Sequence, residues 1–366
     1  MKSHKVIFLR SQLPKTDSRL QRYVSILKEE KIDYLIVGWD RNNSNEIANK
    51  EILYKKKTPI GGGLKNIFSL FLWNVFLFKV LWKKRRSYTK IHAVDFDTAI
   101  PAYLMSKLLR KEYILDIYDK YTDARNMPVF FSVIIDLIEY FCCIKATKLI
   151  LPDVCRVKQL KLEKKIIPLV IENVPIVPTF RKRTEKTYFP PIVFSYVGIL
   201  ESKNRGLENL LDVISKYPNN TKLLIAGDGE LREYIEQATK NNCNIVFFGS
   251  VSQQKALEIM DESHIVVGMY YKTVKNHRYA SPNKYYEHLF LEKALLTTEG
   301  TPPGDKVLAH NTGYVIGESK KDIENVIKNF SISQWTSFVQ NAGEIWSDRY
   351  ANYRNRMKQE YISALM

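Results

Sequence analysis

Two sets of short apolar segments, one in each half of the chain, constrain the fold more than any other feature. Each segment is rich in β-branched residues and ends at turn-forming residues, and stretches long enough for helices separate them. This alternation is typical of parallel strands connected by helices. The first set of predicted strands covers residues 6–9, 34–37, 91–94, 113–117, 148–151 and 166–171. The second set covers residues 192–197, 222–226, 244–248, 265–269, 294–297 and 313–316.

We therefore expect an α/β fold with two Rossmann-like domains, each a doubly wound parallel sheet. The length of 366 residues agrees with two domains. Residues 176–191 are rich in prolines and charges, which suits a linker and not a central strand. The N-terminal domain should then span residues 1–175 and the C-terminal domain residues 192–335. Residues 336–366 return to helical apolar spacing, and we expect this helix to cross back onto the first domain.

The charge balance favours anionic partners. The chain carries 56 Lys and Arg against 39 Asp and Glu, which gives a net charge of +17. Such an excess suits phosphate-bearing ligands or an anionic membrane surface. Nucleic acid is a weaker alternative, because no recognisable helix-turn-helix, zinc-finger or RNP module accompanies the charge. We expect no nucleic-acid partner.

The four cysteines show neither CxxC spacing nor a histidine at metal-ligand distance. We therefore expect free thiols in a cytoplasmic protein. The apolar stretch at residues 6–9 is too short for the core of a signal peptide, which agrees with that location.

A predicted loop and helix in the second half carry the most informative residues. Ligands of open parallel sheets bind outside the carboxyl ends of the strands, so two facing domains predict a shared cleft there. Ser281 suits an N-cap and Pro282 the first helical position, which leaves helix amides free to face an anion. Lys284 in the first turn is unfavourable for the helix dipole unless an anion offsets it. Glu287, one turn after Asn283, could accept hydrogen bonds from both hydroxyls of a ribose. A solvated carboxylate is the alternative for Glu287.

Two glycine turns precede this segment. Gly198 ends a predicted strand and would let the backbone approach a ligand. Arg205 in the following basic loop offers a forked donor to phosphate oxygens, and Lys203 is a weaker candidate. A surface loop charge is the alternative for both. Gly227 lies in a Gly-Asp-Gly turn after the next strand, which alone indicates only a turn.

These three segments, in this order, resemble the C-terminal domain of glycosyltransferase family 4. That family shows Val-Gly-x-Leu with Lys/Arg-Gly-Leu-Glu, then Gly-Asp-Gly-x-Leu, then a nucleotide motif that takes the form Ser-Pro-x-Lys-x-x-Glu here. Residues 91–102 and 113–121 resemble the family's acceptor domain, so the similarity spans most of the chain. The resemblance implies a GT-B fold and retaining transfer of a hexosyl or deoxyhexosyl group from a UDP- or GDP-sugar. The acceptor would be a glycan or a polyprenyl-diphosphate-linked glycan in bacterial-type surface polysaccharide assembly.

The resemblance also implies residue roles. Glu287 would hold the donor ribose, while Arg205 and Lys284 would neutralise the diphosphate without a metal ion. Amides of residues 281–284 would assist, and Gly227 would border the nucleotide.

Two positions depart from the family pattern. Tyr279 stands where the family's first paired glutamate touches the donor sugar, and Ile199 stands where an arginine often follows the glycine. The first departure leaves open an alternative function, a catalytically silent scaffold that binds nucleotide sugars or lipid.

The acceptor-site candidates are Arg19, Asp95, Asp97, Asp116, Tyr118 and Asp119. Asp95 and Asp97 follow a predicted strand and could orient the acceptor, with helix capping as the alternative for Asp97. Their Asp-x-Asp spacing resembles a metal site of the other glycosyltransferase fold, but it lies in the wrong domain and we expect no metal. Tyr118 occupies the place of an acceptor-site histidine in relatives. Asp116 and Asp119 are acceptor contacts or strand-end caps, and Arg19, after the expected N-cap Asp17, could meet an acceptor phosphate.

An apolar segment over residues 67–82 raises the question of a membrane. Sixteen helical residues span about 24 Å, short of the roughly 30 Å hydrocarbon core. We expect a monotopic helix at the inner face of the cytoplasmic membrane, with a buried domain helix as the alternative. The expected membrane contacts are Phe71, Trp73, Phe78, Trp82, Lys83, Lys84, Arg85 and Arg86.

Overall fold

The computed structural model describes residues 5–41, 49–58, 64–125, 127–176, 180 and 189–366. The chain divides into two compact units, one of Met1–Glu172 with Arg354–Met366 and the other of Asn173–Tyr353. Of the expected linker at residues 176–191, residues 177–179 and 181–188 lie outside the described part.

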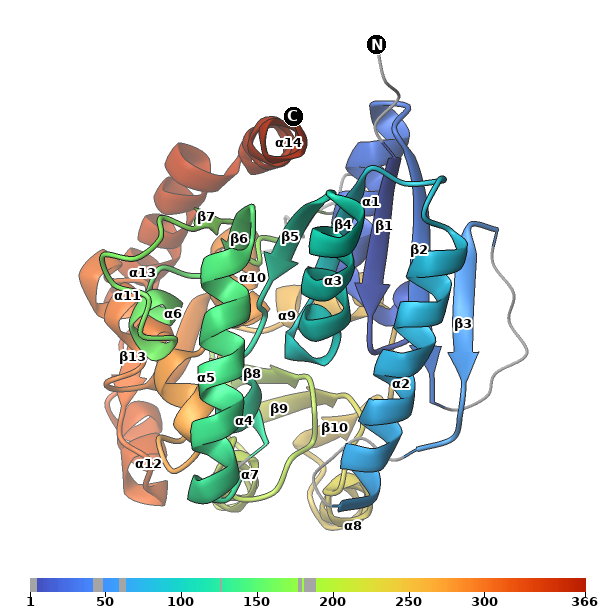
Figure 1. The fold of residues 1–366 in the computed structure, drawn as a ribbon. Helices are drawn as coiled ribbons and strands as arrows, with labels where there is room; N and C mark the ends of the chain where they lie inside the picture. Colours follow the sequence, from blue (N-terminus) through green and yellow to red (C-terminus); the bar gives the residue numbers. More distant parts are fainter. Residues whose placement is uncertain (1–4, 42–48, 59–63, 126, 177–179, 181–188) are drawn as a thin grey trace. The chain divides into compact units, whose positions relative to one another are not determined.

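The first unit contains a seven-stranded parallel sheet in the order β3-β2-β1-β4-β5-β6-β7 (Figure 1). The strands are β1 Lys5–Arg10, β2 Asp33–Asp40, β3 Glu51–Lys55, β4 Lys90–Val94, β5 Glu112–Asp116, β6 Lys148–Leu151 and β7 Leu169–Val170. Six of them confirm the predicted strands. The sequence pattern missed β3, a half-exposed edge strand whose Glu and Lys ends hide its short apolar run.

Helices cover both faces of this sheet, so the central strands are buried and read as continuous apolar runs. The helices are α1 Ser18–Glu29, α2 Leu64–Lys83, α3 Phe96–Leu109, α4 Tyr121–Ala124, α5 Val129–Lys145, α6 Cys155–Gln159 and α14 Tyr353–Leu365. On one face α3 contacts both α2 and α5, and the three helices lie side by side (Figure 1). Elsewhere α14 contacts α1, where Arg354 Nη2 lies 2.8 Å from Glu29 Oε2.

Trp73 of α2 belongs to the core of the first unit. Its indole is fully buried and stacks on Trp39 of β2 at a centroid distance of 5.4 Å. Leu77 and Leu81, one and two turns further along α2, are buried beside it. Our expectation that Trp73 contacts a membrane is therefore wrong, because the side of α2 that carries it packs against the sheet.

The second unit contains a six-stranded parallel sheet in the order β10-β9-β8-β11-β12-β13. The strands are β8 Ile192–Val197, β9 Thr221–Ala226, β10 Ile245–Phe247, β11 Ile265–Gly268, β12 Ala294–Thr298 and β13 Gly313–Ile316, and all six confirm predicted strands. The helices are α7 Leu207–Ile214, α8 Arg232–Asn241, α9 Gln253–Asp261, α10 Asn283–Leu291, α11 Pro302–His310, α12 Lys320–Lys328 and α13 Ile332–Ile345, with short helices η2 Lys275–Tyr279 and η3 Trp346–Tyr350.

Residues 336–366 are not one helix, which corrects the sequence-based expectation. Phe338 and Ala342 of α13 are buried in the core of the second unit. The π-helix η3 follows, and the chain belongs to the first unit only from Arg354 onward. Apolar spacing alone predicted helix here, but it did not show where the chain leaves the second unit.

Candidate functional site

Two glycine turns meet at the carboxyl ends of β8 and β9. Gly198 and Gly227 directly follow these strands with φ angles of 154° and 145°, which side-chain-bearing residues rarely adopt. A Cβ atom on Gly227 would lie 1.8 Å from the carbonyl oxygen of Gly198. The Gly227 amide donates to the carbonyl of Gly249, 2.8 Å away. Only glycine at position 227 therefore lets the two turns approach each other so closely.

Helix α10 begins next to these turns, one residue later than expected. Asn283 is its first residue, and Pro282 is the N-cap with no side-chain capping bond. Ser281 is consequently not the N-cap, and its carbonyl oxygen accepts a hydrogen bond of 2.8 Å from Asn173 Nδ2. A helix start without a side-chain cap retains the positive end of the helix dipole for an anion.

Lys284 extends from α10 to the end of β8. Its ammonium group donates to the carbonyl oxygen of Val197, and a Cβ on Gly198 would lie 3.5 Å from its Nζ atom. Burial lowers the pKa of Lys284, Glu287 raises it and Arg205 lowers it further, so the pKa lies below its ordinary value. A bound anion would favour the charged form of Lys284.

Arg205 interacts electrostatically with Lys284. Its Nε atom pairs with Glu201 Oε2 at 3.2 Å, and its guanidinium lies 5.1 Å from the centroid of the Tyr270 ring. Burial opposes its charge, but Tyr270, Tyr196 and Glu201 outweigh burial and raise the pKa of Arg205. Tyr270 and Glu201 were not among the sequence candidates. Tyr270 could have been found, because it comes two residues after the end of β11, at the ligand-binding edge.

Glu287 completes the group on α10. Burial raises the pKa of Glu287 and Lys284 lowers it, with a net rise. Within the described part of the chain, the carboxylate of Glu287 forms no hydrogen bond and no ion pair. The structure thus brings Arg205, Lys284 and Glu287 into one electrostatically coupled group beside the glycine turns.

The other donor-site candidates lie around this group. Asn283 is exposed in the first turn of α10, and Tyr279 is half-buried at the end of η2. Lys203 has an exposed side chain, and its backbone amide donates to Glu208 Oε1 at 2.9 Å. Within the described residues the Lys203 ammonium makes no ion pair with the coupled group, which makes Arg205 the stronger candidate.

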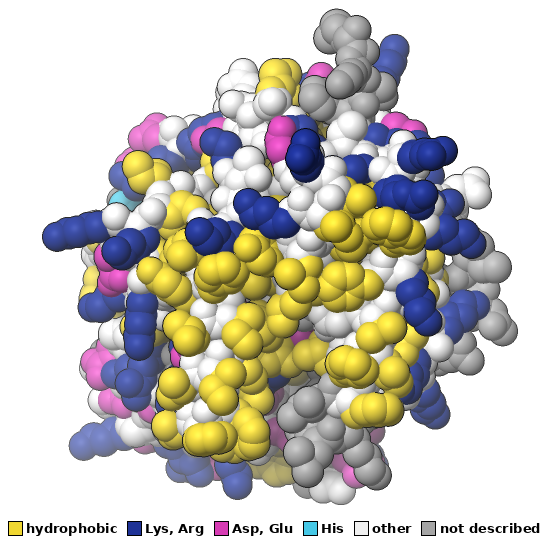
Figure 2. Space-filling view, viewed as in Figure 1, with side chains coloured by type: hydrophobic (Ala, Val, Ile, Leu, Met, Phe, Trp, Pro, Cys, Tyr) yellow, Lys and Arg dark blue, Asp and Glu magenta, His cyan; other side chains and the backbone are white. Residues whose placement is uncertain are grey.

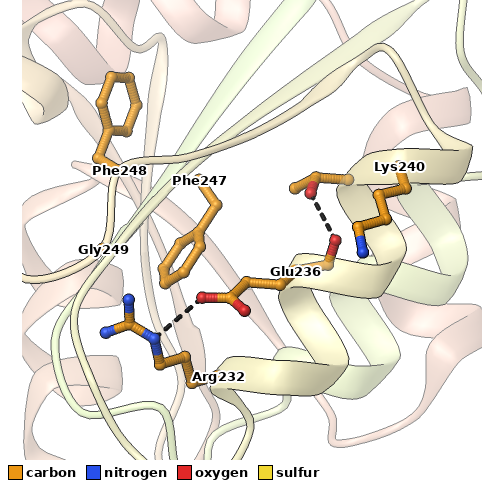
Figure 3. A pocket seen from close by; sticks show the side chains of 7 residues that line it. Arg232, Glu236, Lys240, Phe247, Phe248 and Gly249 are labelled. Atoms are coloured by element: carbon orange, nitrogen blue, oxygen red, sulfur yellow. Dashed lines mark hydrogen bonds and ion pairs between the residues drawn. The ribbon is translucent and has the colours of Figure 1, made fainter.

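A pocket of about 480 Å³ adjoins the Gly227 turn through Gly249 (Figure 3). It lies between α8 and the end of β10, with Phe247 and Phe248 on one side. On the α8 side of the pocket, Arg232 Nε pairs with Glu236 Oε1 at 2.9 Å, one helical turn apart. None of these residues was a sequence candidate, because the pocket arises where an edge strand meets a helix, and nothing in the local sequence marks it.

In the first unit, Asp95 and Asp97 lie in a charged network at the ends of β1 and β4. Asp95 accepts hydrogen bonds from Arg10 Nη1 at 2.5 Å and from the Tyr118 amide at 2.8 Å. Burial raises the pKa of Asp95 to about 6, with Arg10 opposing it. Asp97 accepts from Ser11 Oγ at 2.7 Å and from Arg125 Nη2 at 3.1 Å. The N-cap of α3 is Asp95, whose side chain makes no capping hydrogen bond, so Asp97 does not occupy the N-cap position.

Arg19 and Asp116 form a buried ion pair. Arg19 Nη2 lies 3.0 Å from Asp116 Oδ1 and Arg19 Nε lies 3.1 Å from Oδ2, with exposed side-chain fractions of 4% and 0%. Tyr23 donates to the same carboxylate at 2.7 Å. The expectation of direct acceptor contacts by Arg19 and Asp116 is therefore not supported, because internal partners satisfy both. The pair holds α1 against β5.

The two remaining acceptor candidates are more accessible. The ring of Tyr118 lies 4.6 Å from the Arg10 guanidinium and 5.1 Å from that of Arg19. Asp119 has a half-exposed side chain and pairs with Arg156 Nη2 at 2.7 Å. Asp119, Tyr118 and Asp95 are thus the acceptor candidates that keep some access to solvent.

The expected membrane residues divide between two faces of α2. Phe71 and Trp82 are half-exposed or more, Phe78 is partly buried and Trp73 is buried. Lys83 and Arg86 are exposed, while Lys84 and Arg85 are partly buried. No helix in the described residues is both long and apolar enough to span a bilayer.

The described residues contain no group of three or more His, Cys, Asp or Glu side chains arranged to hold a metal ion. Metal independence stays a prediction.

Comparisons with known proteins match the second unit to a family model and the whole chain to solved structures. Residues 191–330 match the family model described as glycosyl transferases group 1. None of the curated proteins matches the sequence. Among solved structures, Alr3699/HepE of Anabaena, in complex with UDP and glucose, is 14% identical with a TM-score of 0.69 and covers 98% of this chain and 100% of its own.

Two further solved structures also match nearly the whole chain at low sequence identity. Sucrose-phosphate synthase from Thermosynechococcus elongatus is 11% identical with a TM-score of 0.68, and covers 98% of both chains. The lipopolysaccharide outer core galactosyltransferase WaaB is 14% identical with a TM-score of 0.62, and covers 98% of this chain and 99% of its own. The α/β GT-B fold with two Rossmann-like parallel-sheet domains is thereby confirmed. The family match of the second unit and this fold together support a glycosyltransferase.

Proposed function

We propose that the chain is a retaining glycosyltransferase that uses a nucleoside diphosphate sugar, with UDP favoured over GDP. The observation that carries this proposal is the coupled group of Arg205, Lys284 and Glu287 beside the glycine turns of the second unit. Support for UDP comes from the Anabaena protein of similar fold, which was solved with UDP and glucose.

The diphosphate would lie at the start of α10. Negative charge grows on the leaving diphosphate as the glycosidic bond to the sugar breaks, and fixed cations stabilise that charge without reorganising. Lys284 and Arg205 would supply two cations, and the uncapped start of α10 would supply amide donors. The pairing of Arg205 with Glu201 would hold the guanidinium in place while leaving other N–H groups for phosphate oxygens.

Glu287 would bind the ribose. An ionised carboxylate can accept hydrogen bonds from both hydroxyls of a diol, and no partner within the described chain occupies it. Burial raises the pKa of Glu287, and Lys284 opposes that rise and so favours the ionised form.

Retention would proceed on one face of the sugar. The bond between the anomeric carbon and the β-phosphate oxygen breaks, and the acceptor hydroxyl oxygen bonds to the same face of that carbon. The hydroxyl proton passes to the departing phosphate oxygen, so nucleoside diphosphate and glycoside are the products. The transferred group would be a hexosyl or deoxyhexosyl unit. The acceptor would be a glycan or a polyprenyl-diphosphate-linked glycan of a surface polysaccharide, reached at the inner face of the cytoplasmic membrane.

A screen of nucleoside diphosphate sugars by thermal shift, followed by product analysis, tests this function. Wild-type protein should be stabilised by one donor and should release nucleoside diphosphate from it. Glu287→Gln should retain the fold and lose activity by about two orders of magnitude or more. Undiminished turnover by Glu287→Gln would contradict the proposal.

Tyr279 favours a second candidate, a silent scaffold that binds nucleotide sugar or lipid. The residue carries no carboxylate at the place where the resemblance implies contact with the donor sugar. Donor binding without any release of nucleoside diphosphate, with or without acceptor, would favour the scaffold.

A further inference from the structure

Helix α5 presents an apolar surface to solvent. Its most exposed large side chains are Val129, Phe130, Phe131, Val133, Ile134 and Leu137, each between 47% and 75% exposed. The side of α5 that faces the protein instead buries Glu139, Cys142 and Cys143. A surface helix of a soluble domain normally has its polar side outward. On α5 that arrangement is largely reversed, so burial against its own domain does not account for the outward apolar residues.

The apolar surface continues onto the two neighbouring helices. Leu104 and Leu108 of α3 are 47% and 64% exposed, and Phe68 and Phe71 of α2 are 62% and 61% exposed. Figure 2 shows hydrophobic side chains over α5 and α2 in the same view as Figure 1, connected across the middle. We name the outward faces of α2, α3 and α5 the three-helix face. Single exposed apolar residues scattered over a surface are common, but a contiguous apolar patch over adjacent helices marks an interaction site.

The charges around the three-helix face are nearly all positive. The helices run antiparallel to the strands that they connect, so their C-terminal ends lie where the parallel strands begin. Lys83, Lys107 and Lys145 are exposed at these helix ends. Figure 2 shows Lys and Arg side chains along one side of the apolar area. The acidic residues of these helices do not offset them. Asp97 and Glu139 are buried, and Asp136 pairs with Lys120 at 2.7 Å.

We propose that the three-helix face binds the surface of an anionic phospholipid bilayer, with the helices lying in the membrane plane. Aromatic and aliphatic side chains of α5 would enter about 5–10 Å, to the boundary between headgroups and acyl chains. The lysines at the helix ends would contact lipid phosphates. A second copy of the chain is disfavoured, because each copy carries a net charge of +17 and the positive edges would repel. This surface deepens the proposed function, which places a lipid-linked acceptor at a membrane.

This proposal differs from the sequence-based expectation of a membrane-bound α2. Trp73 of α2 packs in the core, and α2 contributes mainly its flank residues Phe68 and Phe71. We therefore assign the principal membrane contact to α5, for which the sequence pattern had indicated no function.

Vesicle co-sedimentation with purified protein tests the three-helix face. The vesicles would contain phosphatidylcholine alone, or phosphatidylcholine and phosphatidylglycerol in equal parts. The first variant combines Phe130→Ser, Val133→Ser and Leu137→Ser, which remove exposed side chains from one side of α5. A matched control combines Ile167→Ser, Leu308→Ser and Ile332→Ser, which are exposed apolar residues outside the three helices. A charge variant combines Lys83→Gln, Lys107→Gln and Lys145→Gln.

Wild type and the matched control should bind the phosphatidylglycerol vesicles with equal affinity. The α5 variant should bind about tenfold more weakly or worse, and the charge variant should lose about as much. Circular dichroism and the thermal shift with UDP should be unchanged in all three variants. Equal vesicle binding by wild type and the α5 variant would overturn the proposal, as would absence of wild-type binding to both vesicle types.

Light scattering of the same samples covers the competing occupant. If wild type is a dimer, the α5 variant is a monomer and neither binds vesicles, the proposal of a membrane-binding face is overturned in favour of self-association. Vesicle binding requires no nucleotide sugar, so failure of the proposed enzymatic function would appear in the donor assays alone and leave this result unaffected.

Discussion

Gly227→Ala tests whether the glycine turns form the donor site. The new Cβ would lie 1.8 Å from the Gly198 carbonyl oxygen, whereas non-bonded Cβ contacts lie at 3.0 Å or more. Backbone must therefore move by about 1.2 Å, the difference of these two distances. The φ angle of 145° adds a conformational cost of about 1–3 kcal/mol, because it is essentially restricted to glycine. We expect the free energy of unfolding to fall by about 3 kcal/mol or more, and UDP binding to weaken by at least about tenfold.

Gly300→Ala provides the matched control. Gly300 also has a positive φ, 64°, but the nearest atom to a new Cβ would be Lys272 Nζ at 3.6 Å, at the end of a flexible side chain. This variant should lose only about 1–2 kcal/mol and keep its UDP affinity. Urea unfolding and calorimetric UDP titration measure both quantities. The reasoning is refuted if Gly227→Ala matches Gly300→Ala in stability and in UDP affinity.

Three further predictions concern the first unit. Asp116→Asn should lower the free energy of unfolding by about 3–5 kcal/mol, since it leaves the Arg19 guanidinium buried without its charge partner; urea unfolding with little change would argue against a structural role of the pair. The pKa of Glu139 is raised by burial to about 8 from an ordinary value of 4.5, so the folded protein holds an extra proton between these values and stability falls as pH rises through that window. Glu139→Gln should therefore be more stable than wild type at pH 8, with the advantage shrinking towards pH 5, and a pH-independent difference would contradict this. Trp73→Ala should cost about 3–5 kcal/mol while Trp82→Ala, at a half-exposed site on the same helix, should cost less than about 1 kcal/mol; equal thermal unfolding of the two would show that α2 does not pack as described.

The sequence was most informative about the sheets. Apolar, β-branched runs between turn residues predicted twelve of the strands, because buried parallel strands need such runs. The sequence pattern missed β3 because an edge strand needs apolar residues on one side only, and charged Glu51 and Lys55 stand at its two ends.

The loops and the helix that carry the proposed donor site were predictable from the sequence to within one residue. Glycine turns, Lys284 and Glu287 are local to strand-to-helix loops, and their order along the chain resembles a known family. The exact start of α10 was missed by one position, since proline suits both the N-cap and the first turn. Glu201 lies only four positions before Arg205, and Tyr270 follows the end of β11, so both were close to recognisable signals. The approach of Tyr270 to Arg205 depends on how two loops meet, which the sequence does not show.

Residues distant in sequence limited the interpretation of the first unit. Arg19 and Asp116 are 97 positions apart, and only the fold shows that they neutralise each other. Trp73 and the outer residues of α5 show the same limit in another form. An apolar run predicts that a helix avoids water, but the sequence does not say which side meets the sheet and which side remains exposed.

Calorimetric titration of UDP into wild type and Lys284→Met tests the central claim most directly, because Lys284 joins α10 to the glycine turn at the end of β8. We expect wild type to bind UDP with one site and Lys284→Met to bind it about tenfold to a hundredfold more weakly, in line with the loss of one charge-assisted hydrogen bond. Unchanged affinity in Lys284→Met, or no binding of UDP or GDP by folded wild type, would contradict a nucleoside diphosphate site at the start of α10.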